Sequence, residues 1–589
     1  MPDCRPLSPT LPHEGGGRQG GRKIWRCAFL LFLCAAPAFA APPQIIAPPP
    51  LDALLQRYLP LEMPEDNNPD ALAAFAERIE REGRELLATE GYFNARLQLT
   101  GDTPENFVIQ VEPGARAWVE QVDIIIDGAV PEARQAALRE AWALKVDAPF
   151  RQADWTTAKE GLLMALMERD FPAARLLESR AAVDAERNRA RLKIHYDSGA
   201  AYRFGALEIS GLKRYSPELV ARYNRQVKAG APYDENRLAA LQSTLENTPY
   251  FASVSVRLDT EAGDVVQTEN DIIVAPVRVQ AREQAPHRLS LGAGVSSNTG
   301  ARVEVNFRTA DLFSRAWQLN SGVRVEQLKQ SAYADIFLPP TPDDDHYAFG
   351  ALVEHSDIRN LKLQTGSLGV SRSRRQGSVE NVLTLSYITE KEISDVLPQS
   401  RNRALTLNSA WTWTPKLAAD AFWFNHVSQI QIGGAIRPVS DQNFARLYGS
   451  TLHNFRLNPR NTLTLRAEGG IVLANRREGI PQNFLFRAGG TQSVRGYAYQ
   501  SLGVKEGDTT FGGRYLLTAS GEFTHWLADS PWGVAAFVDV GNAGDDKKTF
   551  RLQKGYGVGA RWKSEAGAIG VDLAYGNNWH LHFALSLPF

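Results

Sequence analysis

Arg495 is the residue whose position most strongly indicates a functional site. It lies in a Gly-rich stretch between segments that alternate polar and apolar residues as β-strands do. On a surface loop the guanidinium would be solvated, whereas inside a barrel it would need carboxylate partners, because an unpaired buried charge is costly. Glu522 and Asp539 follow on the next two alternating segments, in a phase that would face the same side. The predicted chemistry is a buried ion pair that holds a loop.

The sequence contains no recognisable catalytic or metal-binding motif. The ten histidines form no His-Glu-x-x-His pattern and no zinc spacing, and there is no Gly-x-x-x-x-Gly-Lys-Ser/Thr. The glycines of residues 555–559 are followed by no helix, so we interpret them as strand glycines rather than as a phosphate loop. His580 and His582 lie on one strand face and are predicted to be polar lumen residues. We therefore predict a protein that is not an enzyme, with no catalytic residue, metal or cofactor.

Composition narrows the class of protein. The 589 residues are too many for one ordinary core, so several domains are expected. Lys+Arg 65 against Asp+Glu 66 gives a net charge of −1, which argues against a nucleic-acid partner. The chain is 43% hydrophobic yet has a mean hydropathy of −0.29. Alternating strands give this combination, because polar neighbours dilute their apolar residues.

The N-terminus has the pattern of an export signal. Arg22, Lys23 and Arg26 precede a short apolar run at residues 28–36, and Ala38-Phe39-Ala40 is a small-x-small cleavage site. We predict a signal peptide at 1–40; a membrane anchor or a lipoprotein are the alternatives. All three cysteines lie within the first 34 residues. No later window has the roughly 18 apolar residues of a transmembrane helix, so a membrane-spanning region would have to be a closed barrel.

Residues 41–50 are Pro-rich and predict an extended linker, and residues 51–283 contain an internal repeat. Gly128 and Gly211 each end a strand-like run, 83 residues apart. Phe93, Phe171 and Phe251 each follow a helical segment, with spacings of 78 and 80 residues. We predict three strand–helix–helix–strand–strand units, with the first strand of the first unit unclear. Their ranges are 51–114, 115–198 and 199–283.

Residues 286–589 divide into sixteen alternating segments. An even number suits a bacterial membrane barrel better than a soluble β-sandwich, which would also alternate. The segments are joined by long and short loops in turn, and 474–513, which contains Arg495, is the longest outward loop. Trp411 and Trp532 lie near segment ends, where aromatic girdles of membrane barrels occur. The last segment places Phe583, Leu585, Leu587 and Phe589 on one face.

Several of these features resemble one family. The repeats resemble POTRA domains, the periplasmic modules of outer-membrane assembly and secretion barrels. Gly489-Gly490 followed by Val494, Arg495, Gly496 and Tyr497, together with the barrel, resembles the BamA/TamA superfamily, with a barrel of the bacterial surface antigen type. The resemblance implies that this loop folds into the lumen and that Arg495 contacts Glu522 and Asp539. It also implies that the last segment is the β-signal recognised during barrel assembly, although the usual glycine is missing or displaced.

The resemblance implies a bacterial outer-membrane assembly factor with its N-terminal domains in the periplasm. Its clients would be outer-membrane proteins such as autotransporters, inserted into or moved across the lipid bilayer. Three repeats are typical of the TamA branch, whose members work with a TamB-like periplasm-spanning partner. The alternatives are a two-partner secretion transporter, which exports a soluble client through the barrel, and a passive porin.

Overall fold

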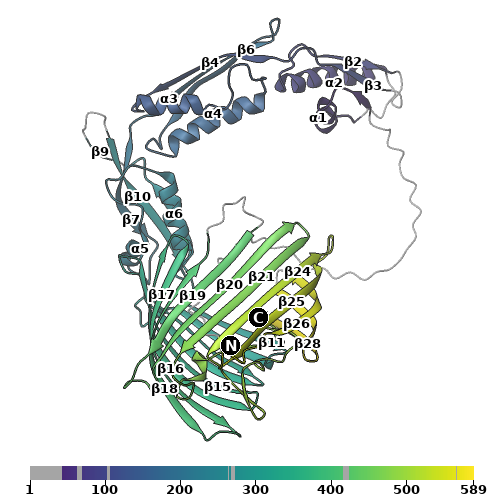
Figure 1. Ribbon diagram of the computed structural model, residues 1–589. Helices are drawn as coiled ribbons and strands as arrows, with labels where there is room; N and C mark the ends of the chain where they lie inside the picture. Colours follow the sequence, from purple (N-terminus) through teal and green to yellow (C-terminus); the bar gives the residue numbers. More distant parts are fainter. Residues whose placement is uncertain are drawn as a thin grey trace, which may run out of the picture.

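The computed structural model describes residues 43–62, 69–101, 107–262, 264–266, 272–415, 424–564 and 567–588. Three small α/β units form an arch that begins at one rim of a large barrel (Figure 1). The predicted signal peptide at 1–40 lies outside the described residues. Among the described helices, none is long and apolar enough to cross a membrane.

Each α/β unit has two helices on one face of a small sheet. In each sheet the last long strand is central, parallel to the first and antiparallel to the one before it. Helix α4 shows why the helices pack: Trp155, Leu162 and Leu166 fall on one face and are buried. The elements are β1 (Gln44–Ile46), α1 (Leu51–Tyr58), α2 (Pro69–Thr89), β2 (Arg96–Thr100), β3 (Val108–Glu112), β4 (Trp118–Asp127), α3 (Glu132–Ala141), α4 (Gln152–Met167), β5 (Arg175–Asp184), β6 (Arg189–Asp197), β7 (Tyr202–Ser210), α5 (Pro217–Tyr223), α6 (Glu235–Glu246), β8 (Phe251–Leu258), β9 (Asp264–Val266) and β10 (Ile272–Glu283).

The segment predicted to be a linker, 41–50, contains the first strand of the first unit. Strand β1 pairs in parallel with β3, and the Gln44 backbone N–H donates to the Phe107 carbonyl at 3.1 Å. Ile45 is buried in the core of the unit. Three strand residues between prolines are too few to show a period of two, so the sequence pattern could not reveal them.

The joints between successive units repeat one hydrogen bond. At each joint, the carbonyl of a residue shortly after the second helix of one unit accepts a hydrogen bond. The donor is a backbone N–H at, or shortly before, the first strand of the unit or barrel that follows. The pairs are Ala117 N–H to Gly91 (2.8 Å), Tyr202 N–H to Asp170 (2.7 Å) and Gln284 N–H to Tyr250 (2.8 Å). The last of these joints connects to the barrel, so the barrel follows the third unit as one unit follows another.

Further contacts hold the third unit against the barrel rim. The Tyr250 hydroxyl donates to the Ala316 carbonyl at 2.8 Å and accepts from Gln318 Nε2 at 3.1 Å. Arg225 Nη2 donates to the Thr341 carbonyl at 2.8 Å. This rim is therefore the end of the barrel that carries the α/β units.

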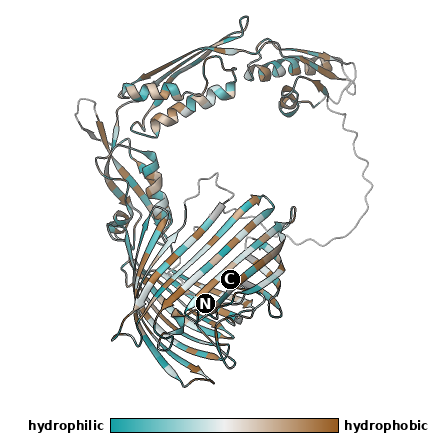
Figure 2. Ribbon diagram, viewed as in Figure 1, coloured by the Kyte–Doolittle hydropathy of each residue, from teal (hydrophilic) through white to brown (hydrophobic). Residues whose placement is uncertain are grey.

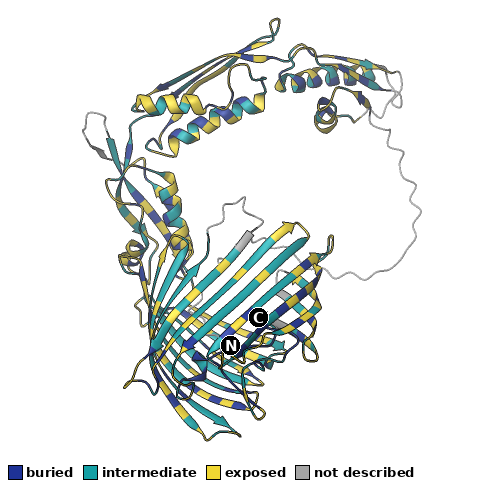
Figure 3. Ribbon diagram, viewed as in Figure 1, coloured by how far each residue is buried: buried dark blue, intermediate teal, exposed yellow. Residues whose placement is uncertain are grey.

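The barrel is closed by sixteen antiparallel strands, one for each predicted segment. The predicted fold class is confirmed. Apolar and polar residues alternate along the strands (Figure 2), and exposed and less exposed residues alternate with them (Figure 3). The strands are β11 (His287–Ser296), β12 (Gly300–Leu312), β13 (Trp317–Glu326), β14 (Lys329–Phe337), β15 (Asp345–Ile358), β16 (Leu361–Gln376), β17 (Val379–Ser394), β18 (Ser400–Trp413), β19 (Phe424–Ala435), β20 (Phe444–Asn458), β21 (Asn461–Leu473), β24 (Tyr515–Trp526), β25 (Trp532–Gly544), β26 (Gln553–Ser564), β27 (Gly567–Tyr575) and β28 (Trp579–Pro588).

Candidate functional site in the barrel lumen

The loop 474–513 folds into the barrel from the end opposite the α/β units. It contains the 3-10 helix η2 (Gln482–Phe484) and the two-stranded hairpin β22 (Val504–Glu506) and β23 (Thr509–Phe511). Its apolar residues pack with strand residues in one buried cluster, whose loop members include Ile480, Phe484, Phe486 and Val494. Burial of these side chains holds the loop inside the lumen.

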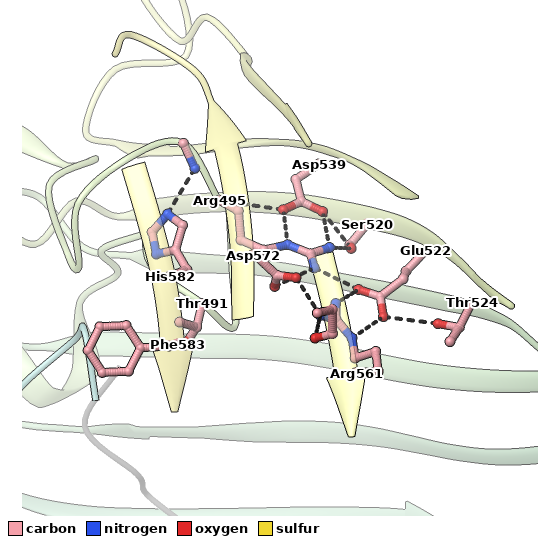
Figure 4. Close-up of polar contacts among 12 residues, drawn as sticks. Thr491, Arg495, Ser520, Glu522, Thr524, Asp539, Arg561, Asp572, His582 and Phe583 are labelled. Atoms are coloured by element: carbon pink, nitrogen blue, oxygen red, sulfur yellow. Dashed lines mark hydrogen bonds and ion pairs between the residues drawn. The ribbon is translucent and has the colours of Figure 1, made fainter. Parts of the chain in front are cut away.

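Arg495 lies at the centre of a polar cluster on the lumen wall (Figure 4). Its backbone N–H and Nε donate to Asp539 Oδ2 at 2.9 and 2.8 Å, and its Nη2 donates to Asp539 Oδ1 at 2.9 Å. Its Nη1 donates to Glu522 Oε2 at 2.6 Å and to Asp572 Oδ2 at 3.2 Å. The Arg495 and Asp539 side chains are 4% and 0% exposed. Water is therefore largely excluded from this ion pair.

A second arginine completes the cluster. Arg561 Nη2 donates to Glu522 Oε2 at 2.8 Å, and Arg561 Nη1 donates to Asp572. The four wall residues come from β24, β25, β26 and β27, which are consecutive neighbours in the barrel. Two guanidinium groups thus share three carboxylates, so removal of the loop arginine would leave buried carboxylates without their main partner.

The wall is shaped to admit the Arg495 backbone and side chain. The Arg495 Cζ lies 3.4 Å from the centre of the Phe537 ring, which is itself buried. A Cβ added at Gly555 would lie 1.8 Å from the Arg495 carbonyl oxygen. Only glycine leaves room for the loop backbone at that position.

The rest of the motif also contacts the wall. The Gly496 N–H donates to His582 Nε2 at 3.0 Å, so this nitrogen acts as an acceptor. Gly496 has a φ of +87°, and a Cβ there would lie 2.5 Å from the Gly576 nitrogen. The Tyr497 hydroxyl donates to Gln553 Oε1 at 3.2 Å. The motif is thus bound along its length, and not only at the arginine.

A second set of contacts holds the loop to β17. The Gln482 N–H donates to Glu390 Oε1 at 2.6 Å, and Gln482 Nε2 donates to Glu392 Oε2 at 2.8 Å. Gln482 Oε1 accepts from the Gly512 N–H at 2.8 Å, which connects η2 to the hairpin. Glu390 is fully buried. The loop therefore spans the lumen between β17 and the β24–β27 wall.

The structure brings together Val494, Arg495, Gly496, Tyr497, Glu522 and Asp539, the residues singled out from the sequence. For the last strand, Phe583 lies half-buried on β28, the side chains of Leu585 and Leu587 are not among the described ones, and Phe589 lies outside the described residues.

Sequence reasoning missed the roles of Asp572, Arg561, Glu390 and His582. Asp572 alternates with the exposed Val571 and Leu573, so strand phase could have placed it in the lumen. Glu390 carried no such signal, because its partner Gln482 lies 92 residues away.

Comparison with known proteins places these features in a family context. Residues 422–587, from the start of β19 to the end of β28, match the model of the Omp85 superfamily domain. The outer membrane protein assembly factor BamA of Nitratidesulfovibrio vulgaris is 28% identical over 171 residues. That stretch is 27% of this chain and 21% of the relative, so the match spans about a fifth of the relative's length.

One solved structure with a TM-score above 0.5 shows a similar fold. A BamA from Haemophilus ducreyi lacking POTRA domains 1–3 superposes with a TM-score of 0.68 at 15% identity, covering 80% of this chain and 100% of that one. CdiB from Acinetobacter baumannii gives a TM-score of 0.47 at 13% identity, covering 90% of this chain and 100% of that one. The matched domain and the BamA relative show a similarity to the BamA/TamA superfamily, and the protein is an outer-membrane β-barrel whose N-terminal POTRA-like domains lie in the periplasm.

Proposed function

We propose that the protein is an outer-membrane assembly factor that inserts client proteins, such as autotransporters, into or across the membrane. The observation that carries the proposal is the junction between the first and last barrel strands. Among the described residues, β11 forms ten residue pairs with β12 but only five with β28, from Gly292–Pro588 to Ser296–Ala584. The edge of β11 at residues 287–291 has no partner in the described part of β28.

This junction has the chemistry of an edge that can accept another strand. Unpaired N–H and C=O groups along a strand can pair with an incoming strand. Pro588 stands opposite Gly292 and has no N–H to donate, so β28 ends the ladder there. A client strand could pair with residues 287–291 and extend along β11 where the pairs with β28 open.

We further propose that the protein belongs to the TamA branch and works with a TamB-like periplasm-spanning partner. Three α/β units precede the barrel, as that branch has, and the arch extends from the periplasmic rim (Figure 1). The first unit is the farthest along the chain from the barrel and is therefore the natural contact for such a partner. Site-specific cross-linking from exposed Tyr58 in cells should capture that partner, and capture from a barrel residue alone would contradict this part of the proposal.

A reversible cross-link tests the role of the junction. No cysteine occurs after Cys34, so Ala293→Cys with Leu587→Cys, two residues directly opposite at the junction, can be oxidised without competing thiols. Oxidation should abolish client assembly, and reduction should restore it. The control pair, Val305→Cys with Val323→Cys, joins β12 to β13 and should leave assembly unchanged.

Full client assembly with the junction cross-linked would overturn the proposal. Export of a soluble client under the same conditions would favour the secretion transporter, because that route passes through the lumen and does not need the junction to open.

A further inference from the structure

The outer face of β15–β18 changes character near its periplasmic end. Toward the middle of the barrel it carries exposed apolar side chains, including Phe349, Leu368, Val370, Leu385 and Leu407. On β16, Arg372 and Arg374 follow Val370 at intervals of two, so they point to the same outer face. No register shift interrupts the pairing of β16 with β15 or β17, so the phase is kept along the whole strand.

One row of directly opposed residues crosses four strands at this level. Asp345 pairs with Arg374, Arg374 with Asn381, and Asn381 with Trp411. The next row toward the membrane centre holds Arg372 beside an apolar neighbour on β17. Two arginines and a tryptophan therefore lie at the periplasmic border of the apolar band. Aromatic girdles of membrane barrels occur at this depth.

The charges in this group do not balance. Arg374 Nε and Nη2 donate to Asp345 Oδ1 and Oδ2 at 2.7 and 2.8 Å, and Arg372 Nη2 reaches the same carboxylate at 2.9 Å. One carboxylate thus serves two guanidinium groups. The Nε of Arg372 is buried and has no hydrogen-bond partner among the described residues. Among these three side chains, one positive charge is left for a ligand.

A hollow lies beside these donors. Its volume is about 300 Å³, and it is lined by Arg372, Arg374, Gln376, Val379, Asn381 and Trp411. A guanidinium matches the oxygens of a phosphate group in geometry and charge. Because the apolar band continues directly from the hollow, a phosphate held there could have its acyl chains along Val370 and Leu385.

We propose that this hollow binds the phosphate of a membrane phospholipid, with a preference for headgroups of net negative charge. Arg372 is the main ligand, Arg374 positions Asp345, and Asp345 limits the affinity by competing for Arg372. An arginine on the outer face of a barrel costs least near the membrane interface and most at the midplane. A lipid phosphate at that depth would offset this cost.

The test is lipid retention by the full chain, measured by native mass spectrometry. The protein is exchanged from vesicles of phosphatidylglycerol and phosphatidylcholine in equal parts into detergent, and the bound phosphatidylglycerol is counted. Arg372→Gln should lower retention about tenfold, the loss of roughly one charge-assisted hydrogen bond. Arg375→Gln is the matched control, because Arg375 adjoins Arg374 on β16 but lies in the opposite phase of the strand and pairs with Glu380.

Asp345→Asn should act in the opposite direction and raise phosphatidylglycerol retention, because it removes the competing carboxylate. Equal losses of phosphatidylglycerol retention in Arg372→Gln and Arg375→Gln, or unchanged retention in Arg372→Gln, would overturn the proposal.

Competition with inorganic phosphate shows whether the hollow binds a lipid phosphate or a free phosphate ion. If millimolar inorganic phosphate displaces the lipid completely, the hollow is a site for free anions and the proposal is wrong; if the lipid stays bound, the acyl chains contribute as proposed.

Discussion

Asp539 receives three hydrogen bonds from one residue, Arg495, through its backbone N–H, Nε and Nη2. The carboxylate therefore holds both the backbone and the side chain of the loop. A contact with the side chain alone would fix the guanidinium but leave the loop backbone free to move.

Arg495→Ala should release the loop and leave the barrel inserted. Removing one partner of a buried ion pair typically costs about 3–5 kcal/mol, because the remaining charges lose their compensation. Limited proteolysis of the loop in intact membranes should become faster, and client assembly should fall. Unchanged protease sensitivity together with unchanged assembly would contradict the role of Arg495, and Arg495→Lys should be intermediate because it lacks the planar fork.

The three carboxylates should not be equivalent. Asp539 is fully buried and accepts from both Arg495 and Ser520, whereas Asp572 is 12% exposed and is 3.2 Å from Arg495 Nη1. Asp539→Asn should therefore loosen the loop more than Asp572→Asn does. Hydrogen exchange of the loop amides should be faster in Asp539→Asn than in Asp572→Asn. Equal exchange rates in the two variants would refute this prediction.

Gly555→Ala should displace the loop without changing any charge. The added Cβ would overlap the Arg495 carbonyl oxygen, 1.8 Å away, so the loop or β26 must shift. Gly469→Ala on β21 is the matched control, because a Cβ there meets no atom within 4 Å. Proteolysis of the loop should increase only in Gly555→Ala. Equal resistance of the loop to protease in both variants would show that the barrel wall shifts to make room for the added Cβ.

Gln482→Ala should free the β22–β23 hairpin while Arg495 stays bound. The variant loses the hydrogen bonds to Glu392 and Gly512 and leaves buried groups unsatisfied, at about 1–3 kcal/mol. Cleavage near the hairpin should rise, with little change around Arg495. Gln364→Ala, on an exposed position of β16, is the control. A uniform rise along the whole loop would show that the two contact regions are not independent.

The segment before α5 in the third unit should loosen in acid, because Glu283 at the end of β10 holds its backbone. Burial opposes ionisation of Glu283, but its Oε1 accepts from the Lys213, Arg214 and Tyr215 N–H groups, and the net effect lowers its pKa. The stabilisation is fully present above the pKa of the unfolded carboxyl, and it is lost as pH falls through the lower folded pKa. Exchange of these three amides should rise in that acid range.

Glu283→Gln should remove most of this pH dependence, because an amide cannot titrate. If exchange of the three amides in Glu283→Gln keeps the pH profile of the parent protein, another group controls the pH dependence of this segment.

The sequence predicts the barrel strands because apolar residues recur at every second position along them. The alternation predicts a strand over Asn461–Leu473, and β21 has the same bounds, since a clear turn precedes it. The alternation also predicts a strand over Val379–Ile388, and β17 extends six residues further, to Ser394. On the outward phase, Thr389 and Lys391 interrupt the apolar pattern, while Glu390 and Glu392 on the inward phase face the loop.

The sequence by itself determined the three repeated units, the sixteen strands and the Arg495–Glu522–Asp539 group, since each depends on a local period or on strand phase. Only the tertiary structure decided that Arg561 and Asp572 join this group, that Gln482 binds β17, and that Arg372 and Arg374 share one carboxylate. Closure of the barrel sets which strands are neighbours, and the path of the loop through the lumen sets which wall it meets. Both depend on contacts between residues far apart in the chain, which no local pattern records.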